Sequence, residues 1–172
     1  MKPTFEQTEE FYKQVTDGRI TLENLQAFLR NPNRGLFASE IHAPELIRNG
    51  WTVVEDVEPA SDLDIGKRKP RSFLRDSDKK GYISGPEMRK RAKEEFKSGN
   101  IGLPDGKSML AEQDKIPVEF RDFYIPLPGT LLRASDGRLR VPYLRWYGKR
   151  WVLDFGWLDD VWFGFGRLAC SE

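Results

Sequence analysis

The feature that most constrains how this chain can fold is a pair of strand-like segments around Gly148 and Lys149. The segment RLRVPYLRWY precedes this dipeptide and RWVLDFGW follows it, and both are rich in the β-branched and aromatic residues that favour strands. A two-residue loop that begins with glycine is typical of a tight β-hairpin. We therefore predict a hairpin with the following pairs: Tyr147 with Arg150, Trp146 with Trp151, Leu144 with Leu153, Pro142 with Phe155 and Arg140 with Trp157.

The predicted register separates the side chains of the hairpin into two faces. The first face is almost entirely large and apolar: Leu144, Trp146, Trp151, Leu153, Phe155 and Trp157, with Arg140 at its edge. The second face mixes aromatic, basic and acidic side chains: Val141, Tyr143, Arg145, Tyr147, Arg150, Val152 and Asp154. Because a slip of one residue would mix these sets, the register is strongly specified, and we predict that the tryptophan-rich face is core.

Strand-like segments fill the C-terminal part of the chain, whereas helical patterns dominate the N-terminal part. From residue 123 onwards, Gly, Pro and Ser-Asp-Gly signals separate the further segments FYIPLP, GTLLRA and VWFGFGRLA. Helical spacing is present in residues 5–16 and 22–30, and residues 51–57 favour a strand. The predicted fold class is α+β, with a short-helix N-terminal lobe and a C-terminal antiparallel β-meander that forms a small open sheet or barrel.

The charge distribution suggests where two lobes would meet. Residues 1–66 carry 12 Asp and Glu against 6 Lys and Arg, whereas residues 67–97 carry 12 Lys and Arg against 5 acids. The segment 58–72 is rich in Pro, Gly and charges, which is typical of a loop or linker. We predict an acidic, mostly helical lobe over 1–66 and a lobe over 67–172 with a basic helix and the sheet. Both could also form one compact domain.

Several classes of site are excluded by residue counts and missing motifs. The only cysteine, Cys170, rules out an internal disulfide and a CxxC pair, and the only histidine, His42, rules out a histidine-rich metal site. The sequence has no GxGxxG or GxxxxGK phosphate loop and no apolar run long enough to cross a bilayer, and because MKPTFEQTEEFYKQ lacks an apolar core we expect no signal peptide. We expect a cytoplasmic protein with no membrane partner.

The stretch DSDKKGYISGPE, residues 76–87, approaches the calcium-binding loop of an EF-hand. The candidate calcium ligands are Asp76, Asp78, Tyr82, Ser84 and Glu87. However, Lys80 stands where an oxygen ligand belongs, and Pro70 leaves little room for the entering helix. Ser84-Gly-Pro-Glu87 also forms a capping box that would begin a helix over 85–97. We favour the helix start and expect no cofactor.

The basic middle of the chain offers a surface for nucleic acid. The candidate residues in this segment are Lys67, Arg68, Lys69, Arg71, Arg75, Arg89, Lys90 and Lys93. The second face of the hairpin adds Tyr143, Arg145, Tyr147 and Arg150. Cations that contact phosphates, together with aromatic rings that stack on bases, are the usual elements of single-strand recognition.

The sequence thus favours a small, non-catalytic, cytosolic binding module. Its favoured partner is nucleic acid, or a protein associated with nucleic acid, bound through the basic segment 67–93. Three alternatives remain: a protein–protein interaction or regulatory module, a degenerate EF-hand-like calcium-binding protein, and a small hydrolase that depends on carboxylates.

Overall fold

The computed structural model describes residues 46–60 and 63–171, which belong to one compact unit over Glu40–Glu172. The predicted helices within residues 5–30, and His42, lie outside the described residues. Most of the predicted lobe 1–66 is therefore not described, and the division of the chain at residue 66 stays a prediction.

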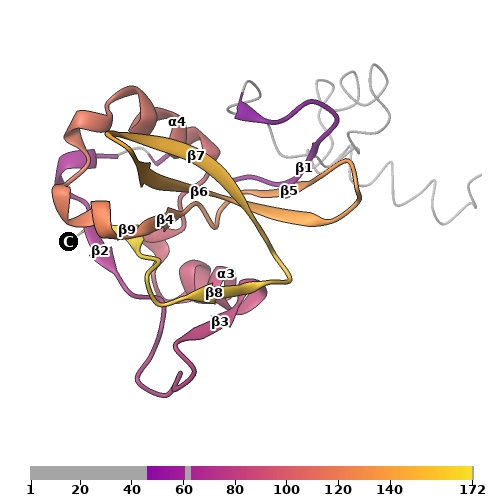
Figure 1. Ribbon diagram of the computed structural model, residues 1–172, viewed down its shortest axis with the longest axis horizontal. Coiled ribbons are helices and arrows are strands. Elements are labelled where there is room, and N and C mark those ends of the chain that lie inside the picture. Colours follow the sequence, from indigo (N-terminus) through magenta and orange to yellow (C-terminus); the bar gives the residue numbers. More distant parts are fainter. Residues whose placement is uncertain (1–45, 61–62, 172) are drawn as a thin grey trace, which may run out of the picture. The chain divides into compact units, whose positions relative to one another are not determined.

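The centre of this unit is an open, antiparallel, five-stranded sheet (Figure 1). Its strands are β1 (Thr52–Glu55), β4 (Tyr124–Pro126), β5 (Leu131–Arg133), β6 (Leu139–Tyr147) and β7 (Arg150–Trp157). β6 is the central strand. β7 pairs with one edge of β6, and β4 and β5 pair with successive segments of its other edge. β1 pairs with β5. The predicted α+β class is confirmed, and in the described residues the sheet does not close into a barrel.

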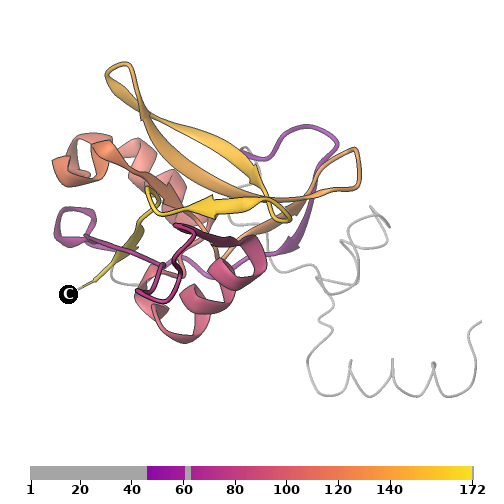
Figure 2. The same cartoon turned by 60° about the horizontal axis from the view of Figure 1, so that its bottom comes forward.

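The predicted hairpin register is confirmed at every pair. Trp146 lies opposite Trp151 and Arg140 lies opposite Trp157. Gly148 has a φ of +69°, which glycine adopts without the steric cost that a Cβ would impose. The tip of the hairpin projects beyond the rest of the sheet (Figure 2). Turn chemistry and side-chain alternation together were enough to fix this part of the fold.

Two short ribbons complete the β-structure. β2 (Lys69–Arg71) pairs with β9 (Leu168–Cys170), and β3 (Tyr82–Ser84) pairs with β8 (Val161–Phe163). The predicted single strand in VWFGFGRLA is therefore wrong, since β8 and β9 belong to different ribbons. The segment 58–72, which we expected to be a loop, contains β2 at its end. Each of these three-residue strands exists because a partner far away in sequence supplies its hydrogen bonds.

Two α-helices lie in the described residues, α3 (Gly85–Glu94) and α4 (Leu103–Ala111). α3 begins as predicted, because the Ser84 hydroxyl accepts a hydrogen bond from the amide of Glu87 at 3.4 Å. The Glu87 carboxylate does not complete the predicted capping box; it accepts from Arg91 Nε instead. α4 begins five residues before the predicted SMLAEQ turn. No helix in the described ranges has the length and apolarity to cross a membrane.

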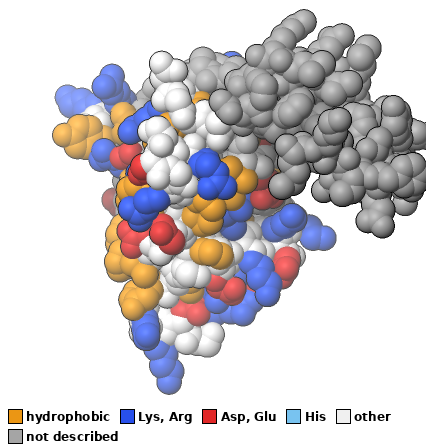
Figure 3. All heavy atoms as spheres, turned by 90° about the vertical axis from the view of Figure 1, so that its right-hand side faces the viewer, with side chains coloured by type: hydrophobic (Ala, Val, Ile, Leu, Met, Phe, Trp, Pro, Cys, Tyr) orange, Lys and Arg blue, Asp and Glu red, His pale blue; other side chains and the backbone are white. Residues whose placement is uncertain are grey.

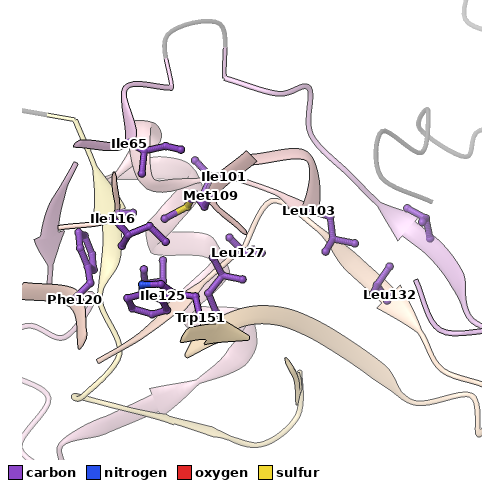
Figure 4. Packing of buried hydrophobic residues seen from close by; sticks show 13 residues of the cluster. Ile65, Ile101, Leu103, Met109, Ile116, Phe120, Ile125, Leu127, Leu132 and Trp151 are labelled. Atoms are coloured by element: carbon purple, nitrogen blue, oxygen red, sulfur yellow. The ribbon is translucent and has the colours of Figure 1, made fainter. Parts of the chain in front are cut away.

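The sheet is covered on both faces, and α4 and α3 lie on opposite sides of it (Figure 1). Leu144 and Trp151 belong to the first core, together with Leu103 and Met109 of α4 (Figure 4). The second core packs α3 against the other face of the sheet. The prediction that the tryptophan-rich face is core is confirmed at Trp151, which is only 2% exposed.

The second face of the hairpin is also partly core. Val141 is buried there among α3 and β8 side chains, and Tyr143 packs against the same cluster. Trp162 of β8 lies over this face, since its ring centroid is 6.2 Å from that of Tyr143. The distal part of the face, at Tyr147 and Arg150, is exposed, and Tyr143 and Arg145 are partly exposed.

Candidate functional site

Two of the arginines that we predicted to contact nucleic acid instead bind carbonyl or carboxylate groups of the protein itself. Arg68, which is only 3% exposed, donates to the carbonyls of Ser98 (2.6 Å) and Ala169 (3.2 Å). Arg89 donates from Nε to the carbonyl of Pro128 at 2.8 Å and forms an ion pair with Glu55 at 2.9 Å. Both guanidinium groups therefore join elements that are distant in sequence.

Arg91 is a third arginine that binds groups of the protein itself, and two of its partners are candidate calcium ligands. Its guanidinium binds Asp78 at 2.5 Å and Glu87 at 2.7 Å, and it donates to the carbonyl of Phe73. Hydrogen bonds from Arg91 and from the Arg75 backbone lower the pKa of Asp78 to about 2. Two of the five candidate calcium ligands thus bind a guanidinium.

The remaining candidate calcium ligands do not converge. Ser84 caps α3, the Tyr82 ring packs edge-on against Phe163, and Asp76 is exposed. In residues 46–60 and 63–171, no group of three or more His, Cys, Asp or Glu side chains is arranged to hold a metal ion.

The other cations of the basic segment are divided between paired and unpaired side chains. Surface ion pairs join Lys67 to Asp64, Arg75 to Glu95, and Lys93 to Glu55. Lys69 lies in β2 and also has an interaction partner. The exposed cations with no ion pair to any described residue are Arg71, Lys79, Lys80 and Lys90. On the face shown in Figure 3, basic, acidic and hydrophobic side chains are interspersed.

The hairpin candidates are only partly brought together. Tyr143 and Arg145 line an open groove, whereas Tyr147 and Arg150 lie beyond it. Arg145 forms an ion pair with Asp154 at 3.2 Å and lies 5.1 Å from the Tyr147 ring centroid. None of the eight basic candidates from the segment 67–93 lines this groove. The predicted set of twelve residues therefore does not form one continuous lining.

The groove itself is open to solvent and has a volume of about 390 Å³. Its lining comes from residues 121–124, from β6 and β7, and from residues 160–165, which include β8. Its lining residues are Arg121, Asp122, Phe123, Tyr124, Tyr143, Arg145, Trp146, Gly156, Trp157, Asp160, Val161, Trp162, Phe163 and Phe165. Most of this surface is apolar or aromatic.

The groove forms because glycines leave room for aromatic rings. A Cβ on Gly156 would lie 2.9 Å from the Trp162 ring, so the indole packs directly on the strand only where no side chain intervenes. A Cβ on Gly166 would lie 2.5 Å from the Tyr124 ring. Hydrogen bonds then fix the two rings, from Trp162 Nε1 to the Trp157 carbonyl at 3.2 Å and from the Tyr124 hydroxyl to the Phe163 carbonyl at 3.1 Å.

The alternation in WFGFG turns two phenylalanines outward. Trp162 points into the protein, whereas Phe163 and Phe165 are 42% and 57% exposed. Their rings are parallel, with an interplanar angle of 7° and a centroid separation of 5.5 Å. Phe165 also meets the Tyr124 ring edge-on at 5.5 Å. Large exposed apolar side chains that gather in this way are typical of an interaction surface.

The ionisable groups of the groove are of two kinds. Arg145 is paired with Asp154, and Arg121 lies over the Trp146 ring at 4.3 Å. Asp122 and Asp160 form no ion pair with a described residue, although Asp160 accepts a hydrogen bond from the Val161 amide at 2.7 Å. Burial raises the pKa of Tyr124 and Tyr143, so both phenols stay neutral at physiological pH.

The aromatic rings on the opposite side of the hairpin differ in their surroundings. The guanidinium groups of Arg138 and Arg140 lie over the Trp157 ring. Arg48 lies 5.4 Å from the Trp51 ring centroid and 5.2 Å from that of Phe155. Desolvation by burial lowers the pKa of Arg140, and its Nε has no hydrogen-bond partner among the described residues. These arginines shield rings that would otherwise be exposed.

Sequence reasoning missed the residues that make the groove, in particular Tyr124, Trp162, Phe163 and Phe165. The available signal was the alternation of aromatic residues with glycine in WFGFG, which on its own suggests only a fragment of a phosphate loop. The rings that pack against this motif come from β4 and β6. Because these strands are distant from it in sequence, the motif itself does not indicate the contact. Comparison of the chain with protein-family models, curated proteins and solved structures found no significant match.

Proposed function

We propose that this protein is a protein-interaction module that docks a segment of a partner polypeptide in the aromatic groove. The observation that carries the proposal is the exposed, parallel pair Phe163 and Phe165 at the wall of an apolar groove. Aromatic residues and arginine are the side chains most enriched at the energetic centres of protein interfaces. The groove combines such a centre with a rim of Arg121, Arg145 and carboxylates.

The charge of the groove supports a polypeptide more than a polyanion. Binding to nucleic acid is dominated by contacts between cations and phosphates. In the groove, Arg145 is already neutralised by Asp154, and the carboxylates of Asp122 and Asp160 would repel phosphate. Apolar burial, which is insensitive to the sign of charge, is therefore the main source of binding energy here.

The expected energy per ring is modest but measurable. Complete burial of a phenylalanine side chain contributes roughly 1.5–3 kcal/mol. Since Phe163 and Phe165 are each about half exposed, docking of a partner should gain roughly 1–2 kcal/mol at each ring, or about five- to thirtyfold in affinity.

A selection from a random peptide library displayed on phage tests this proposal. The full chain serves as target, and the double variant Phe163→Ala/Phe165→Ala serves for counter-selection. We expect enriched peptides to bind the wild-type chain and to lose about five- to thirtyfold in affinity for either single alanine variant. Tyr147→Ala is the matched control, because this exposed ring lies outside the groove.

The contrary result is a library that yields no peptide able to distinguish the wild-type chain from the double variant. Peptides that bind Phe163→Ala/Phe165→Ala and Tyr147→Ala equally well would also overturn the proposal, because their site would lie elsewhere. Circular dichroism of each variant ensures that the comparison is made between folded proteins.

Single-stranded nucleic acid is the second candidate partner, and a specific neighbourhood favours it. Lys79 and Lys80 are exposed in the turn before β3, and none of the described ion pairs includes them. This turn lies next to the stacked phenylalanines, because the Gly164 amide donates to the Gly81 carbonyl at 2.9 Å. Bases could stack on the rings while the lysines contact phosphates.

Fluorescence anisotropy with labelled single-stranded DNA and RNA tests the second candidate. Binding should weaken steeply between roughly 50 and 200 mM salt. Lys79→Glu/Lys80→Glu should abolish binding of the nucleic acid. Lys67→Glu lies in the predicted basic segment but outside the groove, so a loss of binding in this variant would show that the rest of the segment takes part. No salt-dependent binding by the wild-type chain would remove nucleic acid as a partner.

A further inference from the structure

We infer that the aromatic groove accepts a cationic side chain, above all the guanidinium of an arginine, from the docked polypeptide. This inference rests on the proposed docking function and specifies its chemistry. It follows from two independent features of the groove: five of its rings carry no cation from the described residues, and two of its carboxylates have no ion-pair partner among them.

The first feature is a difference in how arginine is distributed over the aromatic rings. An arginine lies over three rings outside the groove, those of Trp51, Tyr147 and Phe155, and over three rings of the groove lining, those of Phe123, Trp146 and Trp157. The groove rings that carry no arginine or lysine from the described residues are Tyr124, Tyr143, Trp162, Phe163 and Phe165. The latter five contact one another, and two of them are substantially exposed.

The electrostatic consequence concerns the faces of these rings. An aromatic face carries partial negative charge, and a guanidinium placed over it is attracted by the ring quadrupole. This attraction grows when water is excluded from the contact, as it would be inside a groove closed by a docked segment. The repeated arginine–ring contacts elsewhere in this protein show that its rings accept guanidinium in the expected geometry, for example Arg167 at 4.4 Å from the Phe123 centroid.

The second feature is the state of the acidic side chains. Asp154 is neutralised by Arg145, but Asp122 and Asp160 have no basic partner in the described part of the chain. Both line the groove. A bound guanidinium could stack on a ring while it donates to one of these carboxylates, and its charge strengthens both contacts relative to those of a neutral side chain of the same shape.

The same feature decides between a cationic and an anionic ligand. Arg121 lies over the Trp146 ring and Arg145 is paired with Asp154, so the groove ions that contact neither a ring nor an opposite charge among the described residues are Asp122 and Asp160. A phosphate or a carboxylate would meet like charge at Asp122 and Asp160, whereas a guanidinium would find opposite charge and free rings. Charge complementarity therefore selects a basic segment as the occupant.

The test uses a matched pair of small probes with the full chain. N-acetyl-arginine N-methylamide carries the guanidinium, and N-acetyl-citrulline N-methylamide has nearly the same shape without the charge. We would titrate each probe and follow the indole N–H resonance of Trp162 by NMR. We expect the arginine probe to bind at least about tenfold more tightly than the citrulline probe.

Two variants and two controls locate the site. Phe165→Ala and Asp160→Asn should each weaken the arginine probe by about three- to tenfold. Tyr147→Ala removes an exposed ring outside the groove, and Asp114→Asn removes an exposed carboxylate outside the groove, so both should retain wild-type affinity. A lysine probe distinguishes guanidinium from ammonium, since a planar stack favours arginine.

Equal affinity for the arginine and citrulline probes would overturn the inference, as would the absence of any shift or shifts that persist in Phe165→Ala. The outcome is separable from that of the docking proposal. If library peptides need Phe163 and Phe165 for binding but are not enriched in arginine or lysine, the docking proposal holds and the inference of a cationic ligand is wrong. If the arginine probe binds in the groove but no peptide does, docking fails instead.

Discussion

The two faces of the β6–β7 hairpin are both rich in aromatic rings, yet their rings are used differently. On the first, inner face, Trp151 is buried, and Trp146 and Trp157, which also line the groove, are partly buried beneath arginine side chains. On the outer face, Tyr143 and Trp162 form part of a groove, and neither ring carries a cation from the described residues. A count of aromatic residues therefore says little about recognition. The useful distinction is whether a partly exposed ring is covered by the protein's own side chains.

The charged groups show the same contrast. In the basic segment, Arg68, Arg89 and Arg91 are bound to carbonyls or carboxylates that are fixed by the fold. In the groove, Asp122 and Asp160 have no such partner among the described residues. Charge that is already compensated stabilises the protein, whereas uncompensated charge at a concave surface is available to a ligand. Both comparisons point to the groove rather than to the basic segment.

The largest expected effect comes from the inner face. Trp151→Ala should lower the free energy of unfolding by about 3–5 kcal/mol, because it leaves a large cavity in the first core. Chemical denaturation of the full chain measures this loss. Trp151→Phe should cost much less, since the buried indole N–H donates to no residue in the part of the chain that the structure describes. A loss below about 1 kcal/mol for the alanine variant would contradict the assignment of this ring to the core.

The second effect acts on the floor of the groove. Gly156→Ala places a methyl group 2.9 Å from the Trp162 ring, so the indole must shift or the strand must bend. We expect a destabilisation of about 1–3 kcal/mol, which is typical of overpacking, together with loss of probe binding in the groove. Thermal unfolding and the NMR titration measure the two effects.

A matched glycine provides the control for this change. Gly137 has a positive φ of 81°, but no atom lies within 4 Å of the place that a Cβ would occupy, so Gly137→Ala tests backbone strain without a clash. It should destabilise the chain slightly and leave groove binding intact. If Gly156→Ala binds the arginine probe as well as the wild-type chain does, Trp162 is not part of the binding surface.

The hairpin could be predicted from sequence because its determinants are local. Gly148 and Lys149 define the turn, and alternation along the strand on each side then fixes which side chains share a face. The start of α3 was predictable for the same reason, since Ser84 and Pro86 lie within the first turn of the helix they begin.

The groove could not be predicted, because its parts meet only in the folded chain. β3 and β8 are three residues long, and each pairs with the other across a long separation in sequence. Gly156 and Gly166 matter because of the rings of Trp162 and Tyr124, which approach them from other strands. Likewise, the pairing of Arg91 with Asp78 depends on the packing of α3 against its preceding loop. Composition alone therefore made the segment look like an open basic surface.

The third effect is a dependence of stability on pH that arises from the ion pair between Asp78 and Arg91. Asp78 has a folded pKa of about 2, below the ordinary value of 3.8, because of its hydrogen bonds with Arg91 and the Arg75 backbone. Its stabilising contribution is thus present above about pH 4 and is lost as the pH falls from about 4 to 2. Solvent screening of an ion pair near the surface makes this effect smaller than the packing changes.

Asp78→Asn should therefore flatten the fall of the melting temperature between about pH 4 and 2, measured by circular dichroism. Asp160→Asn is the control, because its carboxylate has no ion-pair partner among the described residues, and it should preserve the wild-type profile. Identical profiles for wild type and Asp78→Asn would show that the pair with Arg91 does not stabilise the fold, and the contrast between the two kinds of charge would lose its support.

The smallest expected effect is the most direct test of the difference between the two faces. Phe165 is 57% exposed and contacts Phe163 and Tyr124, so Phe165→Ala should change the free energy of unfolding by no more than about 0.5–1 kcal/mol. The two variants then distinguish a structural ring from a recognition ring, because Trp151→Ala lowers stability whereas Phe165→Ala weakens only binding. A cost above about 2 kcal/mol for Phe165→Ala would place this ring with the core residues. The outer face would then be a second stabilising surface, and the groove would not be a site for a partner.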